Sequence, residues 1–249
     1  MSKAKHDQLH QDLLSLNLHH IAEHYREVLD EAARKNCPAL EVLVQLVSGQ
    51  LSARRDGALA RRVRAARLPK MKTLAEYDFS FPKRIAKQKI LRLFDLQFID
   101  TFQCAVLIGS TGLGKTHLLT ALGYAACERG ISVRFTRAID MINILTTAHQ
   151  NGTLEKKLKE YVRPQLLLLD ELGYLPIDKR GADLMFQVVA SRYETGSIVI
   201  STNRVFKEWG QIFDVDNTLA TAMIDRLMHH GEAILIHGDS YRTKDGNNE

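Results

Sequence analysis

The chain has 249 residues, of which 45% are hydrophobic and 25% are charged, a composition typical of a soluble globular protein. No apolar run approaches the roughly 18 residues that a membrane-spanning helix needs, and the polar amino terminus lacks a secretory signal, so we expect a cytoplasmic protein. The three cysteines are odd in number and have no metal-like spacing, which argues against a disulfide framework.

Residues 1–68 are predicted to be helical, because leucine, isoleucine and valine recur there every three to four positions and Pro38 is suited to begin a helix. We expect these residues to form a small helical domain for assembly or DNA binding. Residues 69–82 are predicted to be an extended linker, and Pro82 to start a helix that leads into a core at 83–249. Two histidine pairs at i, i+4 in the first segment lack a third ligand, which favours packing over metal binding: His6 with His10 and His20 with His24.

A glycine-rich octet at 109–116 follows the short apolar run 104–108. Its pattern, G-x-x-x-x-G-K-[ST], is typical of a loop whose backbone amides surround phosphate oxygens at the start of a helix. Lys115 is expected to reach the β- and γ-phosphates, and the Thr116 hydroxyl to bind Mg²⁺. The candidate nucleotide-binding residues are Gly109, Ser110, Thr111, Gly112, Leu113, Gly114, Lys115, Thr116 and His117.

Two acids, Asp170 and Glu171, follow four consecutive leucines that predict a buried strand. Asp170 is expected to hold Mg²⁺ through water, and Glu171 to polarise the water that attacks ATP. A later strand, 197–201, is followed by Thr202 and Asn203, and an amide there can orient water against the γ-phosphate. The sequence therefore predicts an ATP- and Mg²⁺-dependent hydrolase, with Lys115, Glu171 and Asn203 as catalytic residues.

Strands expected at 104–108, 131–136, 166–170, 197–201 and 232–237 alternate with helices, which predicts an α/β fold with a parallel, doubly wound sheet. A GTPase is disfavoured because no Asn-Lys-x-Asp motif occurs. The layout of loop, acidic strand, polar-ended strand and a later arginine is that of an AAA+ core.

Positive charge is concentrated between residues 51 and 92, where there are thirteen lysines and arginines and only three acidic residues. This segment has a net charge of +10, and the rest of the chain has a net charge of −5. Such a block indicates a polyanionic partner or a solvated face. Aromatic residues are sparse in it, which favours contact with a duplex backbone over stacking on single-stranded bases. A basic helix docked on an acidic protein remains an alternative. The candidate DNA-binding residues are Arg54, Arg55, Arg61, Arg62, Arg64 and Arg67.

Several strings in the chain resemble the IstB family, the ATPase helpers of insertion-sequence transposases, which are relatives of the helicase loader DnaC and the initiator DnaA. They are Gly-Lys-Thr-His-Leu (114–118), Leu-Asp-Glu-Leu-Gly-Tyr-Leu-Pro (169–176), Ser-Arg-Tyr-Glu (191–194), Asp-Arg-Leu-Met-His-His (225–230) and Gly-Asp-Ser-Tyr-Arg (238–242). The resemblance extends from the amino-terminal helices to Arg242. It implies a protein that assembles on duplex DNA with ATP, deforms it and presents it to a partner transposase as a target.

In the AAA+ class a neighbouring subunit donates an arginine to the ATP site. Arg226 is the best candidate for that role, with Arg204 and Arg192 as competitors, and we expect a head-to-tail homo-oligomer. Only twelve residues follow the last predicted strand, so no carboxy-terminal helical lid is expected, and Arg242 is a candidate phosphate contact. Two other functions stay open: a replicative helicase loader acting on single-stranded DNA, and an ATP-gated scaffold without catalysis.

Overall fold

A computed structural model describes residues 3–213 and 217–241. The chain divides into two compact units, Met1–Arg61 and Arg62–Glu249. The boundary between them in the sequence falls within a helix, before residue 68, where the helical segment was expected to end. Among the described residues, none of the helices is both long and apolar enough to cross a membrane.

The first unit is built from helices, as predicted for this segment. They are α1 (Lys3–Ser15), α2 (His19–Lys35) and α3 (Ala39–Ala66), the last of which continues into the second unit. The ring of Tyr25 is buried, and its hydroxyl donates a hydrogen bond to the His6 carbonyl at 3.0 Å. A ridge of apolar side chains on α3 stays exposed, with 48–71% of each surface open to solvent: Leu40, Leu43, Val44, Val47 and Leu51.

The second unit is a three-layer α/β structure. Its strands are β1 (Arg84–Ile85), β2 (Ala105–Ile108), β3 (Val133–Arg137), β4 (Leu166–Leu172), β5 (Ser197–Thr202) and β6 (Glu232–His237). Its helices after α3 are η1 (Leu74–Glu76), α4 (Lys87–Phe94), α5 (Gln97–Asp100), α6 (Lys115–Glu128), α7 (Ala138–Gln150), α8 (Leu154–Val162), α9 (Lys179–Arg192), η2 (Phe206–Glu208), α10 (Trp209–Ile212) and α11 (Asn217–His229).

The strands form one sheet in the order β1-β6-β2-β5-β4-β3. All neighbours are parallel except β1, which runs antiparallel to β6 at the sheet edge. The parallel sheet is thus confirmed, with β1 as an addition. The expected helix at Pro82 is wrong: residues 84–85 pair with β6 instead, and the helix begins at Lys87.

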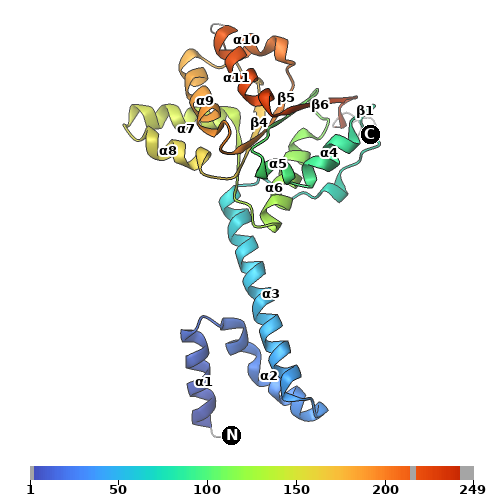
Figure 1. The fold of residues 1–249 in the computed structure, drawn as a ribbon, viewed down its shortest axis with the longest axis vertical. Helices are drawn as coiled ribbons and strands as arrows, with labels where there is room; N and C mark the ends of the chain where they lie inside the picture. The colour runs from blue at the N-terminus through green and yellow to red at the C-terminus, as the bar shows by residue number, and fades with distance from the viewer. Residues whose placement is uncertain (1–2, 214–216, 242–249) are drawn as a thin grey trace, which may run out of the picture. The chain divides into compact units, whose positions relative to one another are not determined.

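Helices cover both faces of the sheet, which confirms the doubly wound architecture. Figure 1 shows α7, α8, α9 and α11 on one side and α4 and α6 on the other. Alternate leucines of β4 divide between the two layers: Leu167 and Leu169 pack with α7 and α9, and Leu168 lies next to Gly123 of α6. Both faces of the strands are therefore buried, which explains their continuous apolar sequences.

The carboxyl ends of β2, β4 and β5 lie together because these strands are parallel neighbours, with Ile108 opposite Thr202. Ligands of open α/β sheets bind at this edge. The predicted phosphate loop and both predicted acids lie there.

Candidate nucleotide site

The phosphate loop connects β2 to the first turn of α6. Gly112 and Gly114 adopt left-handed backbone angles, with φ of +85° and +76°, which only glycine adopts without strain. α6 begins at Lys115, so the loop lies at the positive end of a fourteen-residue helix. The Lys115 ammonium donates to the carbonyls of Gly109 at 2.6 Å and Ser110 at 2.7 Å, which holds its charge within the loop.

Asp170 is joined to the loop through Thr116. The Thr116 hydroxyl donates to one carboxylate oxygen of Asp170 at 2.8 Å, and the Ser201 hydroxyl donates to the other. Asp170 is only 2% exposed, so these hydrogen bonds satisfy a carboxylate that water barely reaches. A carboxylate beside a hydroxyl is an oxygen donor set that fits a hard cation such as Mg²⁺.

Glu171 leaves the ordinary geometry of the strand. Its φ is +58°, and the pairing of β4 with β5 shifts register between Leu169 and Leu172. The Glu171 amide donates to the Ser201 hydroxyl at 3.1 Å, so the same serine contacts both acidic residues. As a result Asp170 stays buried while the Glu171 side chain is exposed beside the phosphate loop.

A cavity of about 450 Å³ opens at this edge of the sheet, a volume suited to a nucleotide. It brings together residues of the loop and of the ends of β4 and β5. Its lining includes Thr111, Gly112, Leu113, Gly114, Lys115, Thr116, His117, Glu171, Ser201, Thr202 and Asn203, and also Lys72, Glu76, Tyr77, Asp78, Phe81, Tyr174 and Tyr241.

The segment predicted to be a linker contributes one wall of this cavity. The buried Tyr77 hydroxyl donates to the Leu113 carbonyl at 3.0 Å, and the His117 ring lies 2.8 Å from the Thr73 carbonyl. Burial raises the pKa of Tyr77 to about 12, so the phenol stays protonated and remains a donor. Residues 73–77 thus pack on the phosphate loop.

Residues 240 and 241, at the end of the described chain, also contact the phosphate loop. The Tyr241 amide donates to the Gly112 carbonyl at 3.1 Å, and a Cβ added to Gly112 would collide with Ser240. The Tyr241 ring meets Phe81 edge to face, with centroids 4.7 Å apart. Arg242, the predicted phosphate contact, lies outside the residues that the structure describes.

The three candidate trans-acting arginines have different surroundings. Arg226 lies over the Phe186 ring at 4.8 Å and donates to the Ala222 carbonyl; among the residues the structure describes, it is not one that lines the cavity. Arg204 is exposed and pairs with Glu208 at 3.6 Å. Arg192 is only 1% exposed and donates to five backbone carbonyls of its own domain, which excludes it as a residue offered to a neighbour.

The predicted DNA-binding arginines lie on α3 or just after it. Arg55, Arg61, Arg64 and Arg67 are exposed. The remaining two also make contacts within their own units: Arg62 donates to the Cys127 carbonyl at 2.7 Å, and Arg54 to the Asn17 carbonyl at 3.3 Å.

Several residues of the cavity wall were not predicted from the sequence, among them Ser201, Tyr77 and Tyr241. Ser201 follows the apolar residues 198–200 of β5, and a polar residue at that point is the one signal that could have indicated it. The family-like string 238–242 contains Tyr241 but does not indicate that it packs on the phosphate loop, and Tyr77 lies outside every motif.

These features define a P-loop nucleotide-binding core of the AAA+ class, and solved structures share the fold. AMPPCP-bound DnaA from Aquifex aeolicus superposes with a TM-score of 0.58, covering 70% of this chain and 52% of that chain at 24% sequence identity. The DnaC helicase loader superposes with a TM-score of 0.52, covering 65% of this chain and 96% of the loader at 23% identity. At these identities the likeness concerns the fold.

The family follows from sequence comparison. Residues 11–248 match the model of the IstB-like ATP binding proteins, so the chain belongs to that family and binds ATP, as the motifs predicted. A Bacillus thuringiensis subsp. berliner relative named as an ATP-binding protein of insertion sequence IS232 is 37% identical, over 98% of this chain and 97% of its own length. A Pseudomonas aeruginosa relative named for insertion sequence IS21 is 36% identical, over 94% and 88% of the two chains.

Proposed function

We propose that this protein is a Mg²⁺-dependent ATPase that assembles on duplex DNA and assists the transposase of its insertion sequence. The observation that carries the proposal is the contact of Thr116 and Asp170 at the nucleotide cavity, with Glu171 exposed beside them, in a chain whose near-full-length relatives are named for insertion sequences.

The hydrolytic roles follow from the positions of these side chains. The Lys115 ammonium would leave the loop carbonyls and contact the β- and γ-phosphates of ATP. Thr116 and Asp170 would hold Mg²⁺, which supplies charge neutralisation of the phosphates. Glu171, exposed to the cavity, would orient the attacking water, with the side-chain amide of Asn203, just after β5, as its partner.

The DNA role is supported by the concentration of positive charge. Arg55, Arg61, Arg64 and Arg67 are exposed within a segment of net charge +10, and guanidinium groups pair with phosphates in a bidentate manner. Backbone contacts of this kind position a protein without reading bases, so we expect low sequence specificity.

ATP binding would join subunits head to tail, and repeated basic segments would offset the cost of bending a duplex, about 1–6 kcal/mol.

A helicase loader is the second candidate, because the DnaC loader shares the fold. Duplex and single-stranded DNA of matched length, tested with ATP and ADP at two salt concentrations, distinguish the two functions. ATP-dependent, salt-sensitive duplex binding that is lost in Lys115→Ala supports the transposition helper. Preference for single strands would replace it with the loader, and absence of DNA binding would assign the basic segment to a protein partner.

A charge-matched pair of variants tests the basic segment itself. Arg61→Gln/Arg64→Gln should weaken duplex binding and reduce its salt dependence, because phosphate contacts are lost. Lys156→Gln/Arg163→Gln removes two exposed positive charges elsewhere and is the control. Equal weakening by the two pairs would show that net charge, and not this segment, attracts DNA.

Glu171→Gln tests the catalytic role. We expect ATP binding to persist and hydrolysis to fall by about 10²–10⁴-fold, because an amide cannot take the proton of the attacking water. The DNA-bound oligomer should then persist with ATP. Steady-state ATPase rates and size-exclusion chromatography with DNA measure both effects, with Glu155→Gln on the surface of α8 as the control. Undiminished turnover would remove Glu171 from the mechanism.

A further inference from the structure

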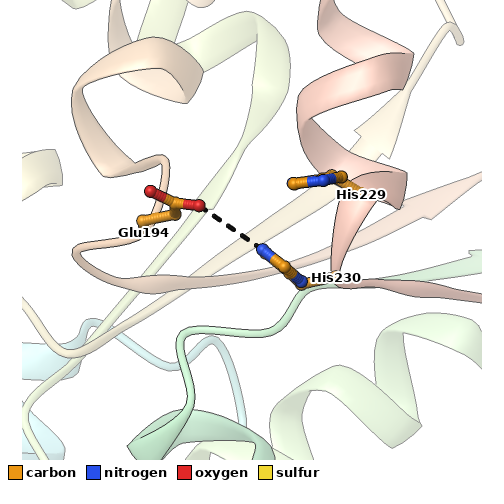
Figure 2. A group of neighbouring side chains, drawn as sticks. All are labelled: Glu194, His229 and His230. Atoms are coloured by element: carbon orange, nitrogen blue, oxygen red, sulfur yellow. Dashed lines mark hydrogen bonds and ion pairs between the residues drawn. The ribbon is translucent and has the colours of Figure 1, made fainter.

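Three side chains with metal-binding chemistry meet outside the nucleotide cavity. Glu194 lies in the turn after α9, His229 is the last residue of α11, and His230 follows it. Figure 2 shows His230 and Glu194 pointing toward one another, with His229 beside them. Because α11 ends at His229, the two histidines are not held at successive positions of one helix, and their ring centroids lie only 4.1 Å apart.

The spacing of these groups is close to that of a metal site. One potential ligand atom from each residue lies within 4.8 Å of those from the other two, and His230 Nε2 is 3.4 Å from Glu194 Oε1. Two ligands on a tetrahedral Zn²⁺, each about 2.0–2.2 Å from the ion, are about 3.4 Å apart. The His230–Glu194 pair already has this separation. All three side chains are exposed, so small rotations can bring the third ligand into place.

A further contact orients His229. Its Nδ1 lies 2.7 Å from the Tyr193 hydroxyl. When Nδ1 carries a proton toward that oxygen, Nε2 keeps its lone pair for a metal. Histidine ligands in metal sites commonly have such a partner on the second ring nitrogen, which fixes the tautomer and the ring orientation.

An ion pair between His230 and Glu194 accounts for two of the three side chains. It does not involve His229, whose ring centroid lies 4.1 Å from that of His230, whereas two imidazoles and one carboxylate form a ligand set that binds Zn²⁺ and leaves a fourth position for water. Imidazole also selects borderline transition metals over Mg²⁺, which prefers oxygen ligands.

We propose that Glu194, His229 and His230 bind one divalent transition-metal ion of the Zn²⁺ class, at a site separate from the nucleotide cavity. Arg226 lines the same small hollow as Glu194 and His230, so a bound ion adds positive charge beside that arginine. An effect on subunit assembly would rest on the proposed role of Arg226, but metal binding itself does not depend on the proposed ATPase function.

Isothermal titration of the untagged, full-length, nucleotide-free protein with Zn²⁺, in excess Mg²⁺, tests the site. We expect one ion per chain. His229→Gln/His230→Gln should weaken binding at least tenfold, Glu194→Gln should weaken it because an amide oxygen carries no charge, and Tyr193→Phe should weaken it about 10–100-fold through the lost outer contact. The matched control is His20→Gln/His24→Gln, which removes a different pair of neighbouring histidines, with ring centroids 4.2 Å apart.

Retention of Zn²⁺ binding in the His229/His230 variant, or its loss in the His20/His24 variant, would overturn the proposal, as would no binding by the wild-type protein. Circular dichroism and ATP binding should be unchanged in every variant, since none of these residues lines the nucleotide cavity within the part of the chain the structure describes. Loss of Zn²⁺ binding with unchanged ATP binding therefore distinguishes a change at the metal site from a change at the nucleotide site.

Discussion

A single buried hydroxyl organises the acidic residues of the site. Ser201 is 1% exposed; it donates to the Asp170 carboxylate and accepts from the Glu171 amide, where the backbone has a φ of +58°. A left-handed glutamate costs about 1–3 kcal/mol and persists only where its surroundings hold it. Ser201 therefore fixes how Glu171 departs from the strand.

Replacing Ser201 by alanine tests this role. We expect the kcat of ATP hydrolysis to fall about tenfold or more while ATP affinity changes little, because a hydrogen bond to a charged group contributes about 1.5–3 kcal/mol. Steady-state kinetics separates kcat from KM, and Ser201→Thr should restore part of the rate. Ser197→Ala is the control, since Ser197 is a buried serine of the same strand whose hydroxyl bonds the Phe98 carbonyl. Equal losses in the two alanine variants would indicate strand stability alone.

At the scale of elements, one arginine joins segments at the amino edge of the sheet. Arg192, the last residue of α9, donates to the carbonyls of Tyr161 and Val162 at the end of α8, of Pro164 and Gln165 before β4, and of Ser197 in β5. Burial lowers its pKa to about 10, which still leaves the guanidinium charged at neutral pH. These hydrogen bonds compensate for removing the charge from water.

Arg192→Met should therefore lower the free energy of unfolding by about 3–5 kcal/mol, because it leaves buried carbonyls without donors. Urea denaturation followed by fluorescence measures this, and the single tryptophan, Trp209, is fully buried in the second unit. Arg204→Met, at an exposed position, should change stability by less than about 0.5 kcal/mol. Similar midpoints for the two variants would contradict the structural role of Arg192.

The phosphate loop also packs against the segment after β6, through Gly112 and Ser240. Gly112→Ala should weaken ATP binding, because a Cβ at φ +85° is strained and would collide with Ser240. Gly152→Ala, also at positive φ but with open space around it, is the matched control. Nucleotide titration measures both, and an unchanged affinity in Gly112→Ala would show that the terminal segment does not constrain the loop.

At the scale of the whole molecule, Arg226 and the nucleotide cavity belong to different parts of the second unit. Arg226 shares a small hollow with Phe102 and Cys104, just before the amino end of β2, whereas the phosphate loop follows the carboxyl end of that strand. In the proposed head-to-tail assembly, Arg226 would act on the site of a second copy.

Mixing two inactive variants tests that assembly. Lys115→Ala lacks a working ATP site, and Arg226→Ala lacks the donated arginine, so each should hydrolyse ATP slowly by itself. A mixture should regain part of the activity, because some interfaces combine an intact site with an intact arginine. Mixing Lys115→Ala with Glu171→Gln, both defective in the same site, is the control. A mixture as inactive as its components would assign Arg226 a role within its own subunit.

The sequence by itself determined the strand and helix alternation, the phosphate loop and the position of Asp170 and Glu171 at a strand end. These features depend on local periodicity, and parallel strands necessarily bring their carboxyl ends to one edge. Only the tertiary structure decided that Tyr77 and Tyr241 pack around the loop, that Ser201 joins the two acids, that Arg192 is buried, and that Glu194 meets the two histidines. Those contacts join residues far apart in the chain, and no local pattern encodes which of them will meet.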